Sequence, residues 1–288
     1  MHKDKSYYKI YESAHINNLW FIFKVAWQIV KKLGAPYRRK RRGRPLKLEP
    51  MQAAVLLIVQ VAQHRTFRAS EELAPALFQR SVDHVTIWRY FHRLSGGYLR
   101  KAVSLLFSLV YLQVRESVMF MLDSTGVSCD RSSDSLKLHA LAIYSSEHSR
   151  LAVASAAITP FNVHDVKPAK ELLIAGNGEV LNADAAYDSH RLRRTARKLG
   201  FVPNFKYRRT SAPTPQEQAR YPFNKESYRF RGLVEGIFGS MEVRHGNSTR
   251  CRLAGSRIKD LLLKVVAFNL RSYMLAMAAF KYGTFILW

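Results

Sequence analysis

The chain has 288 residues, of which 46 are Lys or Arg and 21 are Asp or Glu, giving a formal net charge of +25 at pH 7. This length suits about two domains with cores of their own, and a hydrophobic share of 48% excludes a disordered polycation. The charge predicts a polyanionic partner, with nucleic acid as the first expectation and an anionic membrane surface or a ribosomal setting as the alternatives.

The cysteine content and the apolar runs indicate the compartment. Cys129 and Cys251 are too few for a disulfide framework and lack the spacing of a metal site, so a reducing cytosol is expected. No apolar run is expected to span a membrane, because polar residues interrupt the runs at 19–23 and 102–114. Neither end resembles a cleaved export signal.

The first 49 residues are expected to hold an amphipathic helix at 18–33 and a basic linker at 38–45. Gly and Pro keep such a linker extended, and extended arginines suit phosphates and narrow minor grooves. Arg42-Gly43-Arg44-Pro45 is similar to a minor-groove AT-hook, so Arg42 and Arg44 are candidate DNA contacts. A solvated basic linker without DNA contacts is the alternative.

Residues 50–115 are predicted to form an all-α domain. Helices are expected at about 50–61, 69–77 and 81–94, followed by a helix at 98–114 that leads into the next domain. On the third helix Val85, Trp88 and Phe91-His92 are expected on one stripe. The other stripe holds the candidate DNA contacts Thr86, Arg89 and Arg93. This is a helix-turn-helix pattern, and an ordinary bundle helix with a solvated charged face is the alternative.

Two apolar runs each end in an aspartate. Residues 117–125 predict a buried central strand that delivers Asp123 to the edge of a sheet, and residues 179–184 deliver Asp184 in the same way. A third carboxylate, Glu235, falls on a predicted helix. Three convergent carboxylates without Cys or His suit hard divalent cations, so a site for Mg²⁺ or Mn²⁺ is expected.

The order of the remaining elements predicts the fold of the segment 116–288. Strands are expected at 135–144, 151–159 and 201–205, helices at 165–175 and 188–200, a loop at 207–224 and a long helix at 256–280. This order is typical of an α/β, RNase H-like mixed sheet flanked by helices. Asp188 is interpreted as a helix cap and Asp184 as the ligand, because only Asp184 ends the apolar run.

A set of short motifs in this segment resembles the DDE transposases of bacterial and archaeal insertion sequences. The resemblance implies an RNase H-like catalytic core that uses two divalent metal ions, with Asp123, Asp184 and Glu235 as the metal-binding triad. It further implies cleavage of double-stranded DNA at element ends, transfer to target DNA, a homodimer on paired ends and a place in the cytoplasm near the nucleoid. The motifs are Asp123-Ser124-Thr125, Lys137-Leu138-His139, residues 159–165, Ala183 to Ser189, Tyr228-x-x-Arg231-x-x-x-Glu235 and Phe268-Asn269-Leu270.

Several side chains near this triad are candidate DNA contacts. Helical spacing puts Tyr228 and Arg231 on the face of Glu235, where Arg231 is suited to a DNA phosphate. In the family a Lys usually stands seven residues after the Glu, but here that residue is Glu242, which moves the expected contact to Arg244. Lys137 and His139 share one face of a predicted strand, where they either contact DNA or form an exposed edge.

Two other functions remain open from the sequence. One is a catalytically silent DNA-binding protein derived from a transposase, which the presence of all three carboxylates disfavours. The other is an RNase H-like cellular nuclease, which the additional helix-turn-helix-like domain disfavours.

Overall fold

The computed structural model describes residues 17–38, 45–114, 118–130, 134–146, 149–176, 179–208 and 213–282. Arg42 and Arg44 lie outside these ranges. The chain divides into two compact units, one with the described residues up to Gln113 and from Cys251 onward, the other with those from Val114 to Arg250. The domain boundaries expected from the sequence, between residues 49 and 50 and between residues 115 and 116, stay predictions.

The first unit is entirely helical, and its helices begin at capped positions. The side chains of Asn18, Asp83 and Ser95 each accept a hydrogen bond from a backbone N–H of the helix that follows, as N-cap residues do. The helix after Ser95 therefore begins at Gly96, close to where the sequence predicted the preceding helix to end. The helices are α2 (Leu19–Leu33), α3 (Pro50–Ala62), α4 (Leu73–Phe78), α5 (His84–Arg93), α6 (Gly96–Tyr111) and α12 (Ala254–Tyr282).

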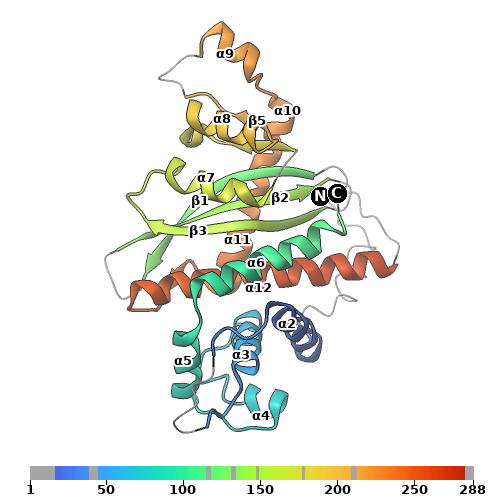
Figure 1. Ribbon diagram of the computed structural model, residues 1–288, viewed down its shortest axis with the longest axis vertical. Helices are drawn as coiled ribbons and strands as arrows, with labels where there is room; N and C mark the ends of the chain where they lie inside the picture. The colour runs from blue at the N-terminus through green and yellow to red at the C-terminus, as the bar shows by residue number, and fades with distance from the viewer. Residues whose placement is uncertain are drawn as a thin grey trace. The chain divides into compact units, whose positions relative to one another are not determined.

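The last helix, α12, belongs to this unit and lies along α6 (Figure 1). Within the described residues, Ala254–Ala279 has the length and apolar composition of a membrane span, so the expectation that no segment reaches that length is wrong. However, 72% of the most apolar stretch of this helix is buried inside the protein. That burial is typical of the core helix of a soluble domain.

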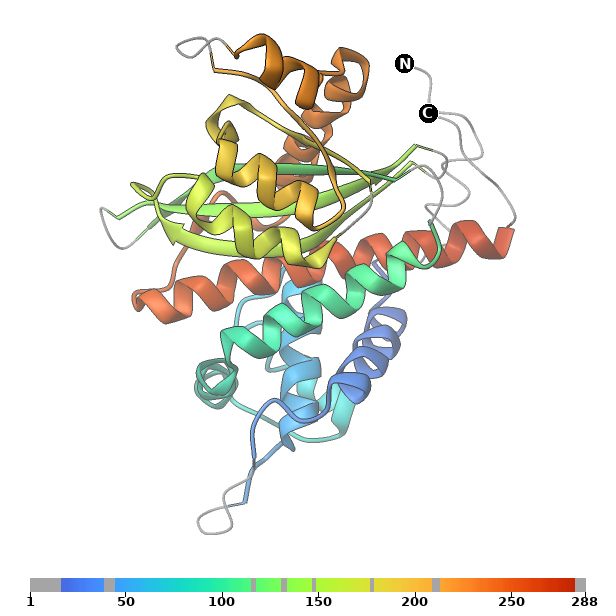
Figure 2. The same ribbon diagram turned by 45° about the horizontal axis from the view of Figure 1, so that its top comes forward.

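The second unit is built on a mixed sheet with the order β3-β2-β1-β4-β5 (Figure 2). Its first three strands form an antiparallel meander, and β4 and β5 run parallel to the central β1. This topology confirms the predicted RNase H-like fold. The strands are β1 (Val118–Cys129), β2 (Leu136–Ser145), β3 (Arg150–Pro160), β4 (Val180–Ala183), β5 (Val202–Phe205) and the short β6 (Ser248–Thr249), which pairs with the end of β1.

Helices surround this sheet on both faces. β2 and β3 contact α7, and α8 packs beside α7 over β5, whereas α11 contacts β1. These elements are α7 (Val166–Leu172), continued by η1 (Leu173–Ala175), then η2 (Ala185–Tyr187), α8 (His190–Lys198), α9 (Pro215–Arg220), α10 (Lys225–Tyr228), η3 (Arg229–Gly232) and α11 (Leu233–His245).

Three predicted elements differ from the structure. β1 does not end at Asp123, because its pairing with β2 continues to Val127. The predicted loop at 207–224 contains α9, whose start is stabilised by a capping box between Thr214 and Glu217. The predicted helix through Arg231 is interrupted by the 3₁₀ segment η3.

Candidate active site

Asp123 and Asp184 lie at neighbouring positions on adjacent strands. β1 and β4 run parallel with Leu122 paired to Ala183, and each aspartate is the next residue. Since successive residues of a strand point to opposite faces, Asp123 lies on the face of the η3–α11 segment, whereas Ser124 bonds to Asp165 at the start of α7. The parallel register thus brings together two carboxylates that are far apart in the sequence.

The Arg231 guanidinium connects these aspartates to Glu235. Its Nη2 atom donates to Asp123 Oδ2 at 2.8 Å and lies 3.8 Å from Asp184 Oδ2. Its Nη1 atom donates to Glu235 Oε1 at 2.9 Å, one helical turn away. The three predicted triad carboxylates therefore converge on a single cation.

The three carboxylates differ in their exposure. The Asp123 side chain is 9% exposed, that of Asp184 is 34% exposed and that of Glu235 is 64% exposed. Burial raises the pKa of Asp123, while the positive charge of Arg231 opposes this shift. Glu235 thus faces solvent, where a large substrate has access. Asp123 is the buried carboxylate of the site.

The donor set suits a divalent ion in its chemistry. All three groups are carboxylates, the ligands that Mg²⁺ and Mn²⁺ prefer, and Arg231 stands as a cation among them. Within the described residues, no three acidic, His or Cys side chains lie close enough together to hold one ion directly. Metal binding by this triad therefore requires the Arg231 guanidinium to move away from the carboxylates.

A buried set of asparagines fastens the helical segment to the sheet. The Asn204 side-chain amide on β5 donates to Asn182 Oδ1 on β4 at 2.7 Å and to the Asn224 backbone carbonyl at 2.8 Å. Asn204 Oδ1 accepts from the Asn224 N–H at 2.8 Å, and Asn182 contacts Ser227 in α10. These bonds fix the start of the segment that carries Arg231 and Glu235. In the sequence, the only indication of this hydrogen-bond network was a single Asn in each of two apolar strands.

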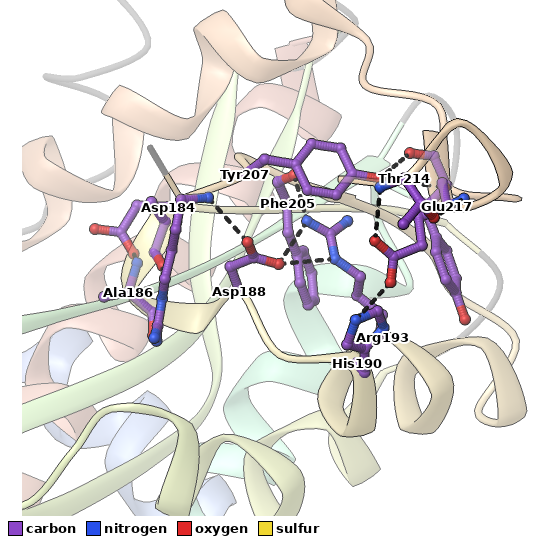
Figure 3. Close-up of polar contacts among 12 residues, drawn as sticks. Asp184, Ala186, Asp188, His190, Arg193, Phe205, Tyr207, Thr214 and Glu217 are labelled. Carbon is purple, nitrogen blue, oxygen red and sulfur yellow. Dashed lines mark hydrogen bonds and ion pairs between the residues drawn. The ribbon is translucent and has the colours of Figure 1, made fainter. Parts of the chain in front are cut away.

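Asp188 forms an ion pair and is not a helix cap (Figure 3). Its Oδ1 atom accepts from both Nε and Nη2 of Arg193, and its Oδ2 atom accepts from the Arg208 backbone N–H. The buried Arg193 guanidinium also donates to the Phe205 carbonyl and lies 4.2 Å from the centre of the Tyr207 ring. This cluster supports the turn after Asp184, and the choice of Asp184 as the ligand stays a prediction.

Lys137 and His139 face the protein interior. Lys137 Nζ donates to Asp165 Oδ1 at 3.1 Å, and His139 Nε2 lies 2.8 Å from Thr159 Oγ1. Their side chains are 18% and 0% exposed, so His139 is not accessible to DNA in this structure. Asp165 precedes α7 but makes no capping hydrogen bond, because its carboxylate accepts from Lys137 and Ser124.

The other candidate DNA contacts of this unit differ in their exposure. Tyr228 is half-buried and packs against Phe223, with ring centres 5.1 Å apart. Arg244 is half-buried near the end of α11. Glu242 is exposed and forms no ion pair with any described residue.

In the helical unit, α5 is placed as predicted but its buried face differs. It buries Ile87, Tyr90 and Phe91, and exposes Arg89 and Arg93. Thr86 Oγ1 donates to Asp83 Oδ2, so its hydroxyl takes part in the helix cap. Of the predicted stripe of Val85, Trp88 and Phe91-His92, Phe91 is buried, whereas Val85 and Trp88 are exposed.

Comparison with protein families identifies a family for this chain. Residues 116–270, more than half of the chain, match the model of a family described as transposase DDE domain. The matched range contains all three converging carboxylates and ends within α12. A comparison with curated proteins finds none that matches the chain.

Proposed function

Because the chain belongs to the transposase DDE domain family, which acts on DNA, we propose that it binds the ends of an insertion element, cleaves them with divalent metal ions and transfers them to target DNA. The observation that carries this proposal is the convergence of Asp123, Asp184 and Glu235 on the Arg231 guanidinium. The carboxylates come from a central strand, its parallel neighbour and a helix, which brings hard oxygen ligands to one exposed point.

Each residue has a distinct part in this proposal. Asp123, Asp184 and Glu235 would hold Mg²⁺ or Mn²⁺ ions, two of them by the family resemblance. When bound, such ions activate water or a 3′-hydroxyl and stabilise the departing oxygen of a phosphodiester. Arg231, released from the carboxylates, is placed to bind a DNA phosphate beside them.

DNA contacts are proposed in both units. In the catalytic unit they are Tyr228 near the triad and Arg244 near the end of α11, and in the helical unit Thr86, Arg89 and Arg93 of α5. Arg42 and Arg44 supply the predicted minor-groove contact. The contacts of Lys137 and His139 with Asp165 and Thr159 favour a role in positioning β1 and β2 over direct DNA contact. We further propose a homodimer on paired ends, in the cytoplasm at the nucleoid.

The test is a cleavage assay with the full-length chain and labelled duplexes taken from the two ends of the element that carries the gene. Asp123→Asn, Asp184→Asn and Glu235→Gln are each expected to abolish cleavage in Mg²⁺ or Mn²⁺ and to leave DNA affinity near that of the wild type, because few phosphate contacts are lost. Glu226→Gln removes an exposed carboxylate from neighbouring α10 and serves as the matched control.

The outcomes separate the proposed function from its alternatives. Binding of end duplexes without cleavage in either metal would indicate a silent DNA-binding protein. Cleavage with no preference for end sequences and no strand transfer would indicate a nuclease. Full Mg²⁺-dependent activity in any one triad variant would remove that residue from the triad.

A further inference from the structure

The outer face of α5 carries two large apolar side chains in an otherwise basic setting. Val85 is 42% exposed and Trp88 is 47% exposed, whereas the helix buries its Ile87, Tyr90 and Phe91 side. α5 lies at the edge of the helical unit (Figure 1). Exposed apolar groups gathered on one helix face commonly mark a binding surface.

Helical spacing places Trp88 and Arg89 next to Val85 on this face, since residues three and four apart are neighbours. Trp88 has a defined position, because its ring packs against that of His92 with centres 4.1 Å apart. Lys259 of α12 donates to the His92 carbonyl at 2.9 Å, which holds the end of α5 against the unit. The face is therefore rigid before any partner binds, and this lowers the entropic cost of binding.

The charges around this face favour a polyanion. Arg89 and Arg93 are exposed along it. The two nearby carboxylates both have partners: Asp83 pairs with Lys47 at 3.1 Å, and Glu71 Oε1 accepts the His84 backbone N–H at 2.7 Å and lies 2.6 Å from His84 Nδ1. Two copies of so basic a face repel each other, and two apolar side chains are far too few for a stable dimer interface. Charge complementarity therefore selects DNA as the occupant.

We propose that α5 enters a major groove of the element ends, where Val85 and Trp88 contact thymine C5-methyl groups. The methyl group of thymine is the apolar feature of the major groove, and apolar side chains recognise it. α4 and the turn that ends at Asp83 precede α5, which is the arrangement of a helix-turn-helix with α5 as its second helix. This inference rests on the proposed function, because it requires sequence-specific binding of element ends.

The experiment compares thymine with uracil in the DNA, since uracil lacks only the C5-methyl group. The full-length chain is titrated with end duplexes in which thymines are replaced by uracil in blocks. For the wild type, one block is expected to lower the affinity by about fourfold for each lost methyl contact. The Val85→Ala/Trp88→Ala variant is expected to bind the thymine duplex more weakly and to show no further loss on uracil.

Two controls match this variant. Trp20→Ala removes a tryptophan that is 58% exposed on α2, and it is expected to keep the wild-type response to uracil. Arg89→Gln is expected to lower affinity and reduce the salt dependence by about one phosphate equivalent, with the uracil response retained. Thermal unfolding of each variant near the wild-type temperature establishes that the substitutions leave the fold intact.

Three results would overturn the inference. The first is an equal loss on uracil in the wild type and the double variant. The second is unchanged DNA binding by the double variant together with a shift from dimer to monomer in light scattering, which would assign the face to a second copy. The third is a wild type that does not distinguish end duplexes from scrambled ones, and only this result also removes end recognition from the proposed function.

Discussion

Arg231 Nη2 and Asp123 Oδ2 lie 2.8 Å apart, and the same guanidinium also reaches Asp184 and Glu235. The single positive charge of Arg231 thereby offsets part of the repulsion among the three carboxylates. Because metal binding requires the same space, Arg231 and divalent ions are expected to compete for the carboxylates. This relationship can be measured without DNA.

Arg231→Ala is expected to lower the free energy of unfolding in EDTA by about 1.5–3 kcal/mol, the usual contribution of hydrogen bonds to charged groups. Mg²⁺ is then expected to raise the melting temperature of this variant more than that of the wild type, because the ion finds its ligands unoccupied. Thermal unfolding in EDTA and in MgCl₂ measures both effects. Arg229→Ala, an exposed neighbour in η3, is the control. An equal response to Mg²⁺ in all three proteins would rule out the competition.

The buried asparagines give a second prediction. Asn204→Ala leaves Asn182 Oδ1 and the Asn224 backbone without their partner, which is expected to cost about 1–3 kcal/mol of stability. Cleavage is expected to fall further than the folded fraction does, because the start of the segment carrying Glu235 loses its anchor. The measurement is cleavage per folded molecule, with the exposed Asn162→Ala as control. Activity that simply follows the folded fraction would refute the positioning role.

Much of this architecture could be predicted from the sequence because it rests on local patterns. The strand that ends at Asp184 and the helices α2, α3 and α5 follow from apolar periodicity and capping residues. The extension of β1 past Asp123 was not predictable, because it depends on pairing with β2 and β6. The contact of Arg231 with all three carboxylates depends on the parallel register of β1 and β4, which no local pattern encodes.

Which side of α5 is buried could not be predicted from the sequence, for a related reason. Its apolar residues recur around most of the helix, so periodicity alone did not decide which of them are buried. The packing of Ile87 and Phe91 against the rest of the unit decides it. Lys137 was correctly assigned to a strand face. Its partner Asp165 could not be predicted in the same way, because Asp165 comes from another element.

His139 gives a prediction for pH dependence. Burial lowers the pKa of His139, although the nearby Asp165 opposes this shift. The folded protein thus binds fewer protons at this site than the unfolded chain does. The contribution of neutral His139 to the free energy of unfolding is therefore fully present above the ordinary pKa of about 6.5, and it is lost as the pH falls below that value. His139→Asn is expected to flatten the fall in melting temperature between about pH 6.5 and 5. The exposed His164→Asn should leave the wild-type slope, and an unchanged slope in His139→Asn would contradict the assignment.

Glu242 gives the last prediction, because it replaces the Lys that the family usually carries. It lies seven residues after Glu235 on α11, and two turns of a helix return to within about 20° of the same direction. Both side chains are exposed, whereas Phe238 and Met241 of the same helix are buried. Glu242 therefore presents a negative charge, without an ion pair among the described residues, on the side of α11 where Glu235 is exposed.

A carboxylate in that position repels DNA phosphates, so Glu242→Lys is expected to tighten binding to element ends. The salt dependence of binding should increase by about one phosphate contact, and strand transfer should rise. Glu226→Lys makes the same charge change at an exposed position of α10 and controls for net charge. Gel shifts over a range of salt concentrations compare the two variants. Weaker binding by Glu242→Lys would mean that the glutamate has a structural role, and the family pattern would then not extend beyond Glu235.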